Sequence, residues 1–381
     1  MQYVTGKLLT ESGFVPGHLG FENGVILEVG KGQRNDALAK GLVIPSMFDA
    51  HTHLGDAFLG PKLRRFKGER TVPALFAPPH GFKHRELRKA SQRAVAGGIR
   101  RSLGEMFRTG SRGFCDFREG GLRGLEPLKA ALRAKPLRGL GPLDVARKHS
   151  PLKGIVLGRP ARLEYDKEEV DGLLARCDGI GVSAVSDWEY PELHKIAADT
   201  RRAGKLFGIH ASEVVRESID AVLDLKPSFI VHLVKAEEFD YERVASEGVP
   251  VVVCPQANAF FGLRPRPDLM ERFGMTVALG TDNAMISPPR MLAAVQAARE
   301  ITRQAGTGAG QVLGWAIDGF RKILNGPESI PFKPGNTADF FVVGNPQMYS
   351  AKDPLAALVG NGGTARTVLA SAGKRIWRRM R

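Results

Sequence analysis

Two histidines separated by a single residue, His51 and His53, follow an apolar run over residues 41–50. In a β-strand, residues i and i+2 face the same side, so two imidazoles with this spacing can bind one metal ion from the end of one strand. Alone, the triplet is a weak signal, because histidines spaced in this way are more often exposed than metal-bound. The metal-binding interpretation therefore depends on residues elsewhere in the chain.

Three further apolar stretches end in a residue that can bind a metal ion, namely His210, His232 and Asp282. If these stretches are parallel strands of one barrel, their carboxyl ends meet at the face where such barrels carry their catalytic groups. Three neutral imidazoles and one carboxylate can bind Zn²⁺, Fe²⁺ or Mn²⁺ and leave room for a water molecule. Such an ion lowers the pKa of its bound water toward neutrality, so the sequence predicts hydrolytic chemistry.

A carboxylate, Glu213, follows His210 by three residues. This spacing keeps the carboxylate near the metal site without making it a ligand, as a proton shuttle requires. Alternatively, Glu213 simply begins a helix, because acidic residues favour first turns. His232 has the alternative of an ordinary core histidine, and Asp282 that of a helix cap or turn residue.

The elements that position these residues alternate between apolar strand-like runs and amphipathic helical stretches, a pattern typical of β-α units around a parallel sheet. Eight strands are expected, at 42–51, 113–118, 154–158, 179–185, 206–210, 229–233, 250–254 and 276–281. Helices are expected between them, for example over 85–109, 167–175, 191–203 and 291–304. The count predicts an α/β fold in which residues 46–330 form a (β/α)8 TIM-type barrel.

Both ends of the chain have a different pattern, with short strands and turns. Asn23 and Gly24 are typical of a hairpin turn, and strand-like stretches return at 335–343 and 364–377. We therefore expect residues 1–45 and 331–381 to form the two parts of one small β-sandwich domain.

One connection, residues 54–83, is long for a link between a strand and a helix. It carries several aromatic residues, so we expect a lid or a wall of the substrate pocket, with a surface excursion as the alternative. Five basic residues lie within 62–70. They would contact an anionic substrate if this segment faces the pocket, but a solvated surface is the simpler interpretation.

Composition restricts the classes of protein that are possible. The 381 residues are 43% hydrophobic, and the formal net charge is +15. Because the basic residues are spread along the chain without interleaved aromatics, no nucleic acid is expected as a partner. No apolar run approaches the length of a membrane span, and the first residues lack signal-peptide features, so we expect a cytoplasmic location and no membrane contact. The three cysteines are widely separated and should be free thiols.

Taken together, the motifs His51-x-His53, His210-x-x-Glu213, His232 and Gly280-Thr-Asp282 resemble the amidohydrolase superfamily. They are most similar to its mononuclear-metal branch, which contains cytosine, guanine and adenosine-type deaminases and triazine chlorohydrolases. Residues 252–258, 335–339 and 20–26 also match, so the resemblance covers nearly the whole chain. A departure is Pro45-Ser46, where relatives often have a glycine after the proline.

The resemblance implies a role for each residue of the motifs. His51, His53, His210 and Asp282 would bind one divalent metal ion, with zinc preferred over iron or manganese. Glu213, His232 and Asp282 would be catalytic: Glu213 would carry protons to a ring nitrogen, and His232 would orient the water or the developing oxyanion. Binuclear members use a carboxylated lysine on the fourth strand, whereas residues 179–188 contain no lysine.

The function expected from these features is hydrolytic deamination of a nucleobase, nucleoside or related small heterocycle, with release of ammonia. The same site could instead hydrolyse a cyclic amide or a chlorinated heterocycle, and a non-catalytic barrel acting as a binding module is a further alternative. Residues that follow strands and could bind the substrate are Glu119, Trp188, Gln256 and Asn258. Trp188 is favoured as a stacking surface, although each of the four could be loop scaffolding. A homo-oligomer is possible.

Overall fold

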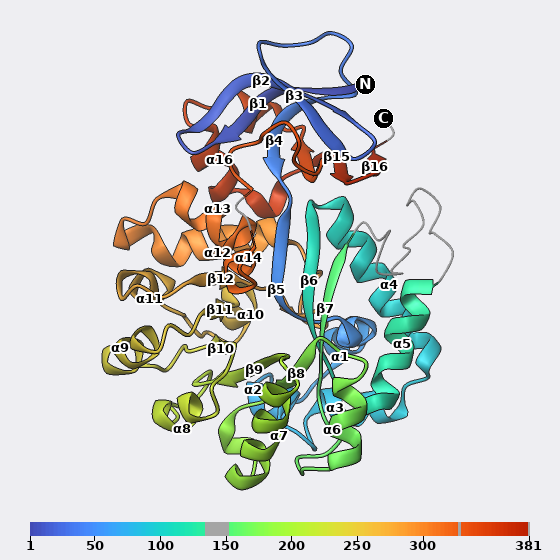
Figure 1. Cartoon of the computed structure of the whole chain (residues 1–381), viewed down its shortest axis with the longest axis vertical. Helices are drawn as coiled ribbons and strands as arrows, with labels where there is room; N and C mark the ends of the chain where they lie inside the picture. The colour runs from blue at the N-terminus through green and yellow to red at the C-terminus, as the bar shows by residue number, and fades with distance from the viewer. Residues whose placement is uncertain (134–151, 327–328, 380–381) are drawn as a thin grey trace.

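A barrel with a terminal sheet stacked on one end makes up the computed structural model, which describes residues 1–133, 152–326 and 329–379 (Figure 1). Eight strands of the barrel pair in parallel with their sequence neighbours. They are β5 (Met47–His53), β6 (Ser111–Arg118), β7 (Lys153–Gly158), β8 (Gly179–Val182), β9 (Leu206–Ala211), β10 (Phe229–His232), β11 (Val251–Val253) and β12 (Val277–Leu279). Each overlaps one of the predicted strands, which confirms the predicted α/β fold.

The barrel closes through the short strand β13 (Asp282–Asn283), which follows β12 after two residues. Asp282 pairs with Thr52 and Asn283 pairs with His53, so the chain leaving the eighth strand joins the first. Gly280 makes this approach possible, because a Cβ atom there would lie 2.8 Å from the Cβ atom of His51. The predicted (β/α)8 architecture is therefore confirmed.

Helices cover the outside of the barrel strands (Figure 1). They include α4 (Gln92–Arg108), α5 (Gly121–Arg133), α6 (Lys167–Leu174), α7 (Tyr190–Arg202), α8 (Ile219–Asp224), α9 (Glu238–Ser246), α10 (Pro255–Phe260), α11 (Pro267–Arg272), α12 (Met291–Thr302), α13 (Ala309–Ile317) and α14 (Gly319–Ile323). In α12 the apolar residues Leu292, Val295 and Ala298 recur at intervals of three and are buried, as expected. The helix expected over 85–109 is divided, because Ala90 is extended and the Ser91 side chain caps α4 at the Ala94 amide.

The two ends of the chain form a single seven-stranded sheet in the order β16-β15-β14-β4-β1-β2-β3. Its strands are β1 (Gln2–Thr10), β2 (Gly13–Glu22), β3 (Val25–Lys31), β4 (Ala39–Pro45), β14 (Phe340–Val343), β15 (Thr367–Ala372) and β16 (Arg375–Arg378), and two short helices, α15 (Pro346–Ser350) and α16 (Pro354–Gly360), lie between β14 and β15. Asn23 and Gly24 both have positive φ, as the predicted hairpin requires.

This terminal sheet curls over its own core. Phe21 on β2 packs against Phe340 on β14 with ring centroids 5.1 Å apart, although β1 and β4 lie between these strands in the sheet. The two facing layers give the sandwich-like arrangement expected for the chain ends. β4 continues into β5 past Ser46, so one extended segment links the sheet to the barrel (Figure 1). The exact domain boundaries at 45 and 331 stay a prediction.

The long connection after β5 is helical rather than irregular. It forms a 3₁₀ helix (Leu54–Leu59), α1 (Gly60–Arg65), α2 (Val72–Phe76) and the start of α3 (Phe82–Lys89). These elements share a small apolar cluster of their own, which includes Leu59, Leu63, Leu75 and Phe82. We refer to residues 54–89 as the lid. It lies at the end of the barrel opposite the terminal sheet (Figure 1).

Candidate metal centre and catalytic pocket

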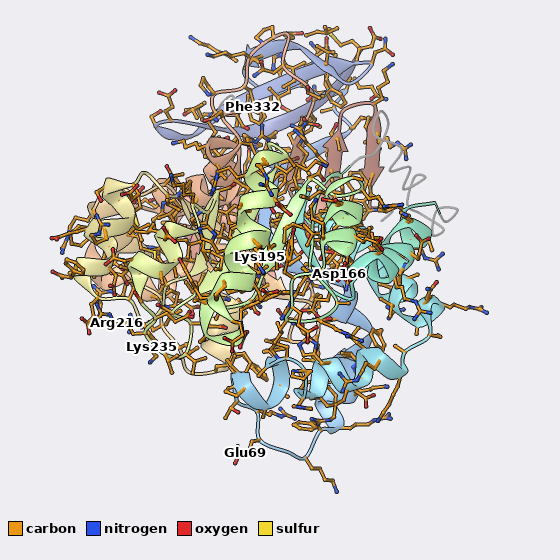
Figure 2. The ribbon with its side chains drawn as sticks, turned by 60° about the horizontal axis from the view of Figure 1, so that its bottom comes forward. Glu69, Asp166, Lys195, Arg216, Lys235 and Phe332 are labelled. Carbon is orange, nitrogen blue, oxygen red and sulfur yellow. The ribbon has the colours of Figure 1, made fainter. Side chains whose placement is uncertain are left out.

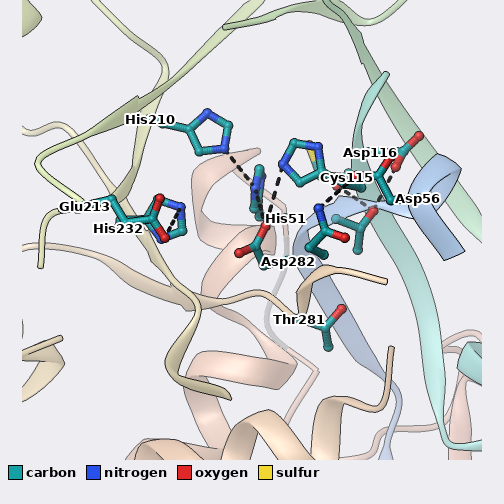
Figure 3. A network of polar contacts seen from close by, with 12 residues as sticks. His51, Asp56, Cys115, Asp116, His210, Glu213, His232, Thr281 and Asp282 are labelled. Atoms are coloured by element: carbon teal, nitrogen blue, oxygen red, sulfur yellow. Dashed lines mark hydrogen bonds and ion pairs between the residues drawn. The ribbon is translucent and has the colours of Figure 1, made fainter. Parts of the chain in front are cut away.

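The four predicted ligands converge at the carboxyl ends of the barrel strands, and three of them, His51, His210 and Asp282, are labelled in Figure 3. The Nε2 atom of His51 lies 3.1 Å from Nε2 of His210 and 3.4 Å from Oδ1 of Asp282. Nε2 of His53 lies 3.6 Å from the same carboxylate oxygen. Atoms bound to a tetrahedral zinc ion at 2.0–2.1 Å are about 3.3 Å apart, so this spacing fits a single shared ion.

The protonation of His210 supports the same conclusion. Its Nδ1 atom lies 2.7 Å from the carbonyl oxygen of Val182, so Nδ1 must carry the hydrogen and Nε2 must carry a lone pair. Metal-bound histidines are commonly oriented by such a bond to their other nitrogen. Burial lowers the pKa of His51, His53 and His210, which keeps these imidazoles neutral. The donor set therefore fits a divalent metal ion.

Asp282 is held by a contact between segments that are far apart in the sequence. The buried carboxylate of Asp49 accepts hydrogen bonds from the amide (2.8 Å) and hydroxyl (2.6 Å) of Thr281. Asp282 itself has φ of 60°, a left-handed conformation that is rare for residues other than glycine. Burial alone would raise the pKa of Asp282, but its hydrogen bond with His51 and the neighbouring imidazoles lower it to about 2. Asp282 is therefore anionic and suited to bind a metal ion.

A second group, Glu213 and His232, lies beside these ligands. Oε1 of Glu213 is 3.6 Å from Nε2 of His232 and accepts a hydrogen bond of 3.2 Å from the Asn258 amide. Burial raises the pKa of Glu213, although the nearby His232 opposes this effect. The next helix, α8, begins only at Ile219, so the alternative in which Glu213 starts a helix is wrong. Its carboxylate faces the cluster instead (Figure 3).

Behind His53 lies a buried network of charges that the sequence analysis identified only in part. Oε1 of Glu119 lies 3.6 Å from Nδ1 of His53, 2.5 Å from Nζ of Lys83 and 3.5 Å from Nη1 of Arg159. Lys83 also lies 3.4 Å from Oδ2 of Asp56. Burial raises the pKa of Asp56 to about 6, against the opposing charge of Lys83. For Glu119, burial acts in the same direction but is outweighed by Lys83, His84 and Arg159, so its pKa is lowered.

A cavity of about 250 Å³ lies in front of both groups. Its lining includes His53, His210, Glu213, His232 and Asp282, together with Lys83, Arg159 and Ser183. The lid supplies Val72, Pro73 and Phe76, so the expected wall of the pocket is present. The five basic residues within 62–70 are not among the lining residues, and Lys62 pairs instead with Glu86.

The four predicted substrate contacts do not line this cavity. Trp188 is the clearest correction: it is buried in the core of the barrel, and its indole N–H donates to the hydroxyl of Ser183 at 3.1 Å. Asn258 and Glu119 lie behind the lining, where they contact Glu213 and Lys83. Gln256 is likewise absent from the lining. Gln256 was selected because it follows a strand, and that position does not show where its side chain points.

Two residues of the cavity wall, Arg159 and Lys83, were missed. Arg159 directly follows β7, and the rule that selected other strand ends could have found it. Lys83 gave no such signal, because it lies thirty residues beyond the first strand and reaches the site only through the fold of the lid.

The fold and the site together define the class of this protein. Residues 42–371 match the model of the amidohydrolase family, and the chain belongs to this family. It is accordingly a hydrolase that acts on carbon–nitrogen bonds.

Relatives and structures agree with this membership. An uncharacterized protein of Methanocaldococcus jannaschii is 33% identical over 303 residues, which cover 74% of this chain and 72% of the relative. A protein of Archaeoglobus fulgidus named "Putative aminohydrolase" is 31% identical over 328 residues, 84% of this chain and 86% of its own. The guanine deaminase of E. coli has a TM-score of 0.74 at 16% identity, with complete coverage of both chains.

Of the lysines and arginines in the described part of the chain, only Lys83 and Arg159 line the cavity. Figure 2 shows Lys195 apart from Arg216 and Lys235, which are labelled together at the lower left of the view. Lys195 pairs with Glu192 at 2.7 Å, and Arg216 pairs with Asp240 at 2.7 Å. Among the described residues, no helix is both long and apolar enough to cross a membrane.

Proposed function

We propose that this chain is a metal-dependent hydrolytic deaminase of a small nitrogen heterocycle, such as a nucleobase, a nucleoside or a related ring. The observation that carries the proposal is the position of Glu213. Its carboxylate faces the same cavity as the four candidate ligands and lies beside His232 and Asp282. An acid with a raised pKa next to a water-activating site is what protonation of a ring nitrogen and a leaving amine requires.

In this proposal His51, His53, His210 and Asp282 hold one divalent ion, with zinc preferred. When bound, the ion supplies the Lewis acidity that makes a water molecule nucleophilic near neutral pH. Residues 179–188, which form β8 and the segment after it, contain no lysine that could bind a second ion. We therefore expect one ion per chain.

The protein residues then account for the protons of the reaction. Water adds to the ring carbon that bears the amine, and Asp282 accepts the proton that this water loses. Glu213 delivers a proton to the adjacent ring nitrogen, while His232 hydrogen-bonds the developing oxygen. The carbon–nitrogen bond then breaks, and the amine leaves as ammonia with the proton that Asp282 had accepted. The hydroxyl proton of the product returns to Glu213, which leaves an oxo group on the ring and restores the acid. Asn258 keeps Glu213 in place.

Two alternatives to deamination are a hydrolase that uses the same metal site on another leaving group and a non-catalytic binding module. Hydrolysis of a chlorinated heterocycle releases chloride, which needs no proton on leaving, so a dedicated acid at Glu213 favours an amine as leaving group. A non-catalytic binding module has no need for a cluster of three histidine nitrogens with the Asp282 carboxylate 3.4–3.6 Å from two of them. The name of the Archaeoglobus fulgidus relative also favours an aminohydrolase.

The test is ammonia release from a panel of nucleobases, nucleosides and pterins, on protein of measured metal content. Glu213→Gln keeps the shape of the side chain but cannot exchange a proton, so kcat should fall by about 10²- to 10⁴-fold. Metal content and KM should stay near those of the parent, because no ligand is changed. Glu189→Gln, on an exposed carboxylate outside the cavity lining, is the matched control.

Normal turnover by Glu213→Gln would remove the proton carrier from the mechanism. Loss of the metal in this variant would show instead that Glu213 is a ligand.

A further inference from the structure

The cavity presents two chemically different walls. On one side Glu213 offers carboxylate oxygens, beside the ligands. Lys83, Arg159 and Ser183 offer N–H and O–H groups instead. Lys83 lies 3.4 Å from Asp56, which is at the opposite end of the polar network from Glu213 (Figure 3). The two carboxylates that balance these cations, Glu119 and Asp56, do not line the cavity.

The donors of this second wall are only partly used by the protein. Lys83 carries three N–H groups, and its nearest acceptors are Glu119 at 2.5 Å and Asp56 at 3.4 Å. Nη2 of Arg159 donates to the hydroxyl oxygen of Ser183 at 3.0 Å. That oxygen also accepts from Trp188, so the hydroxyl hydrogen of Ser183 must point away from both donors. Hydrogen-bonding capacity therefore remains toward the cavity.

The side chains of this wall are also held in place by their carboxylate partners and are largely shielded from solvent. Lys83 is 3% exposed and Arg159 is 7% exposed. Donors held in place by carboxylates behind them need no rearrangement when a ligand arrives, and charged donors form the stronger hydrogen bonds. A ligand without an acceptor at this position would leave buried donors unpaired, which strongly disfavours its binding.

The rest of the cavity restricts the ligand to a small flat ring. Its volume of about 250 Å³ lies below the ~300–1,000 Å³ typical of sites for drug-sized ligands. Val72, Pro73 and Phe76 of the lid cover it with apolar surface, suited to the face of a heterocycle.

We propose that Lys83, Arg159 and Ser183 select heterocycles that carry an oxo group, as a lactam carbonyl or its oxyanion, on the side of the ring turned away from Glu213. This inference rests on the proposed deaminase function, since it names the substrate class of the same cavity. Lys83 is thereby a specificity residue carried by the lid.

The test compares pairs of amines that differ only in the ring oxygen: guanine against 2-aminopurine, and cytosine against 4-aminopyrimidine. We expect the parent protein to release ammonia from an oxo member and to discriminate strongly against its partner. In Lys83→Met, kcat/KM for the oxo compound should fall about ten- to a hundredfold, the effect of one hydrogen bond to a charged group. The partner compound should change little, so the ratio within the pair should collapse. Lys62→Met, on an exposed lysine of the lid, is the control.

Binding is measured separately by calorimetry on the Glu213→Gln variant, with the same four compounds. Preference for the oxo members supports the inference even if no ammonia is released, a result that would count against the deaminase function alone. Equal binding of both members of each pair overturns the inference. So does an equal loss of kcat for both members in Lys83→Met, which would make Lys83 a residue that only positions the lid and Glu119.

If the melting temperature shows that Lys83→Met is unfolded, Arg159→Gln replaces it in the same comparison of kcat/KM within each pair, with the same expected result. If both variants are unfolded, the discrimination by the parent protein decides the question.

Discussion

The two ends of the barrel both contain a cavity lined by buried or half-buried charges, yet only one of them is built for chemistry. At the end that faces the terminal sheet, the cavity is the larger, at about 440 Å³, and its lining includes Arg112, Arg321 and Asp339. There Arg112 lies 2.5 Å from Asp339, and Arg321 lies 3.7 Å from Asp318. Both arginines are matched with a carboxylate, so these charges hold two parts of the fold together.

At the opposite end, ring nitrogens of three imidazoles converge with a carboxylate. Nε2 of His51 lies 3.1 Å from Nε2 of His210 and 3.4 Å from Oδ1 of Asp282, and each of these atoms can bind a metal ion. Such a donor set suits a divalent cation, whereas the arginines at the other end already have carboxylate partners. Converging metal-binding atoms therefore distinguish the two ends better than the size of the cavity does.

The largest effect should come from removing a ligand that has no substitute. Asp282→Asn removes both the anionic ligand and the acceptor for the proton of the attacking water. We expect loss of the metal ion and a fall in kcat of about 10³-fold or more, since acid–base catalysis alone accounts for ~10²–10⁴. Elemental analysis and ammonia release measure the two effects. Full metal content with full turnover would show that the assignment of Asp282 is wrong, as would a second essential ion in the parent protein.

The opposite end of the barrel should respond in stability instead. Arg112→Met leaves the buried carboxylate of Asp339 without its cation, and we expect a loss of about 1–3 kcal/mol in the free energy of unfolding. Chemical denaturation measures this loss, while kcat and KM should not change. Asp339→Asn in the same background should recover part of it, because the amide oxygen can still accept from Gly373. Altered kinetics in Arg112→Met would contradict the division of roles between the two ends.

Much of the barrel and its ligand set could be predicted, because polar residues at the ends of apolar runs are visible in the sequence. Residues that reach the site across long sequence distances could not. The bond between Asp49 and Thr281 joins residues 232 positions apart, and no local pattern marks it. Lys83 is placed by the packing of the lid, and Trp188 was misjudged because its position after a strand does not show that the side chain turns into the core.

The smallest effect is expected from the basic segment of the lid. Arg64 and Arg65 are exposed and do not line the cavity. Charges at such positions are screened by solvent and contribute little to binding inside a closed pocket. Replacing both with Gln should leave KM for neutral and for anionic heterocycles within about twofold of the parent. A tenfold change would correspond to about 1.4 kcal/mol, so the expected change in binding free energy is well below that. Steady-state kinetics at low and high salt check this expectation. A rise in KM for anionic compounds alone, largest at low salt, would place this segment at the pocket mouth during turnover. The wall of Lys83 and Arg159 would then share the recognition of charge with the outer lid.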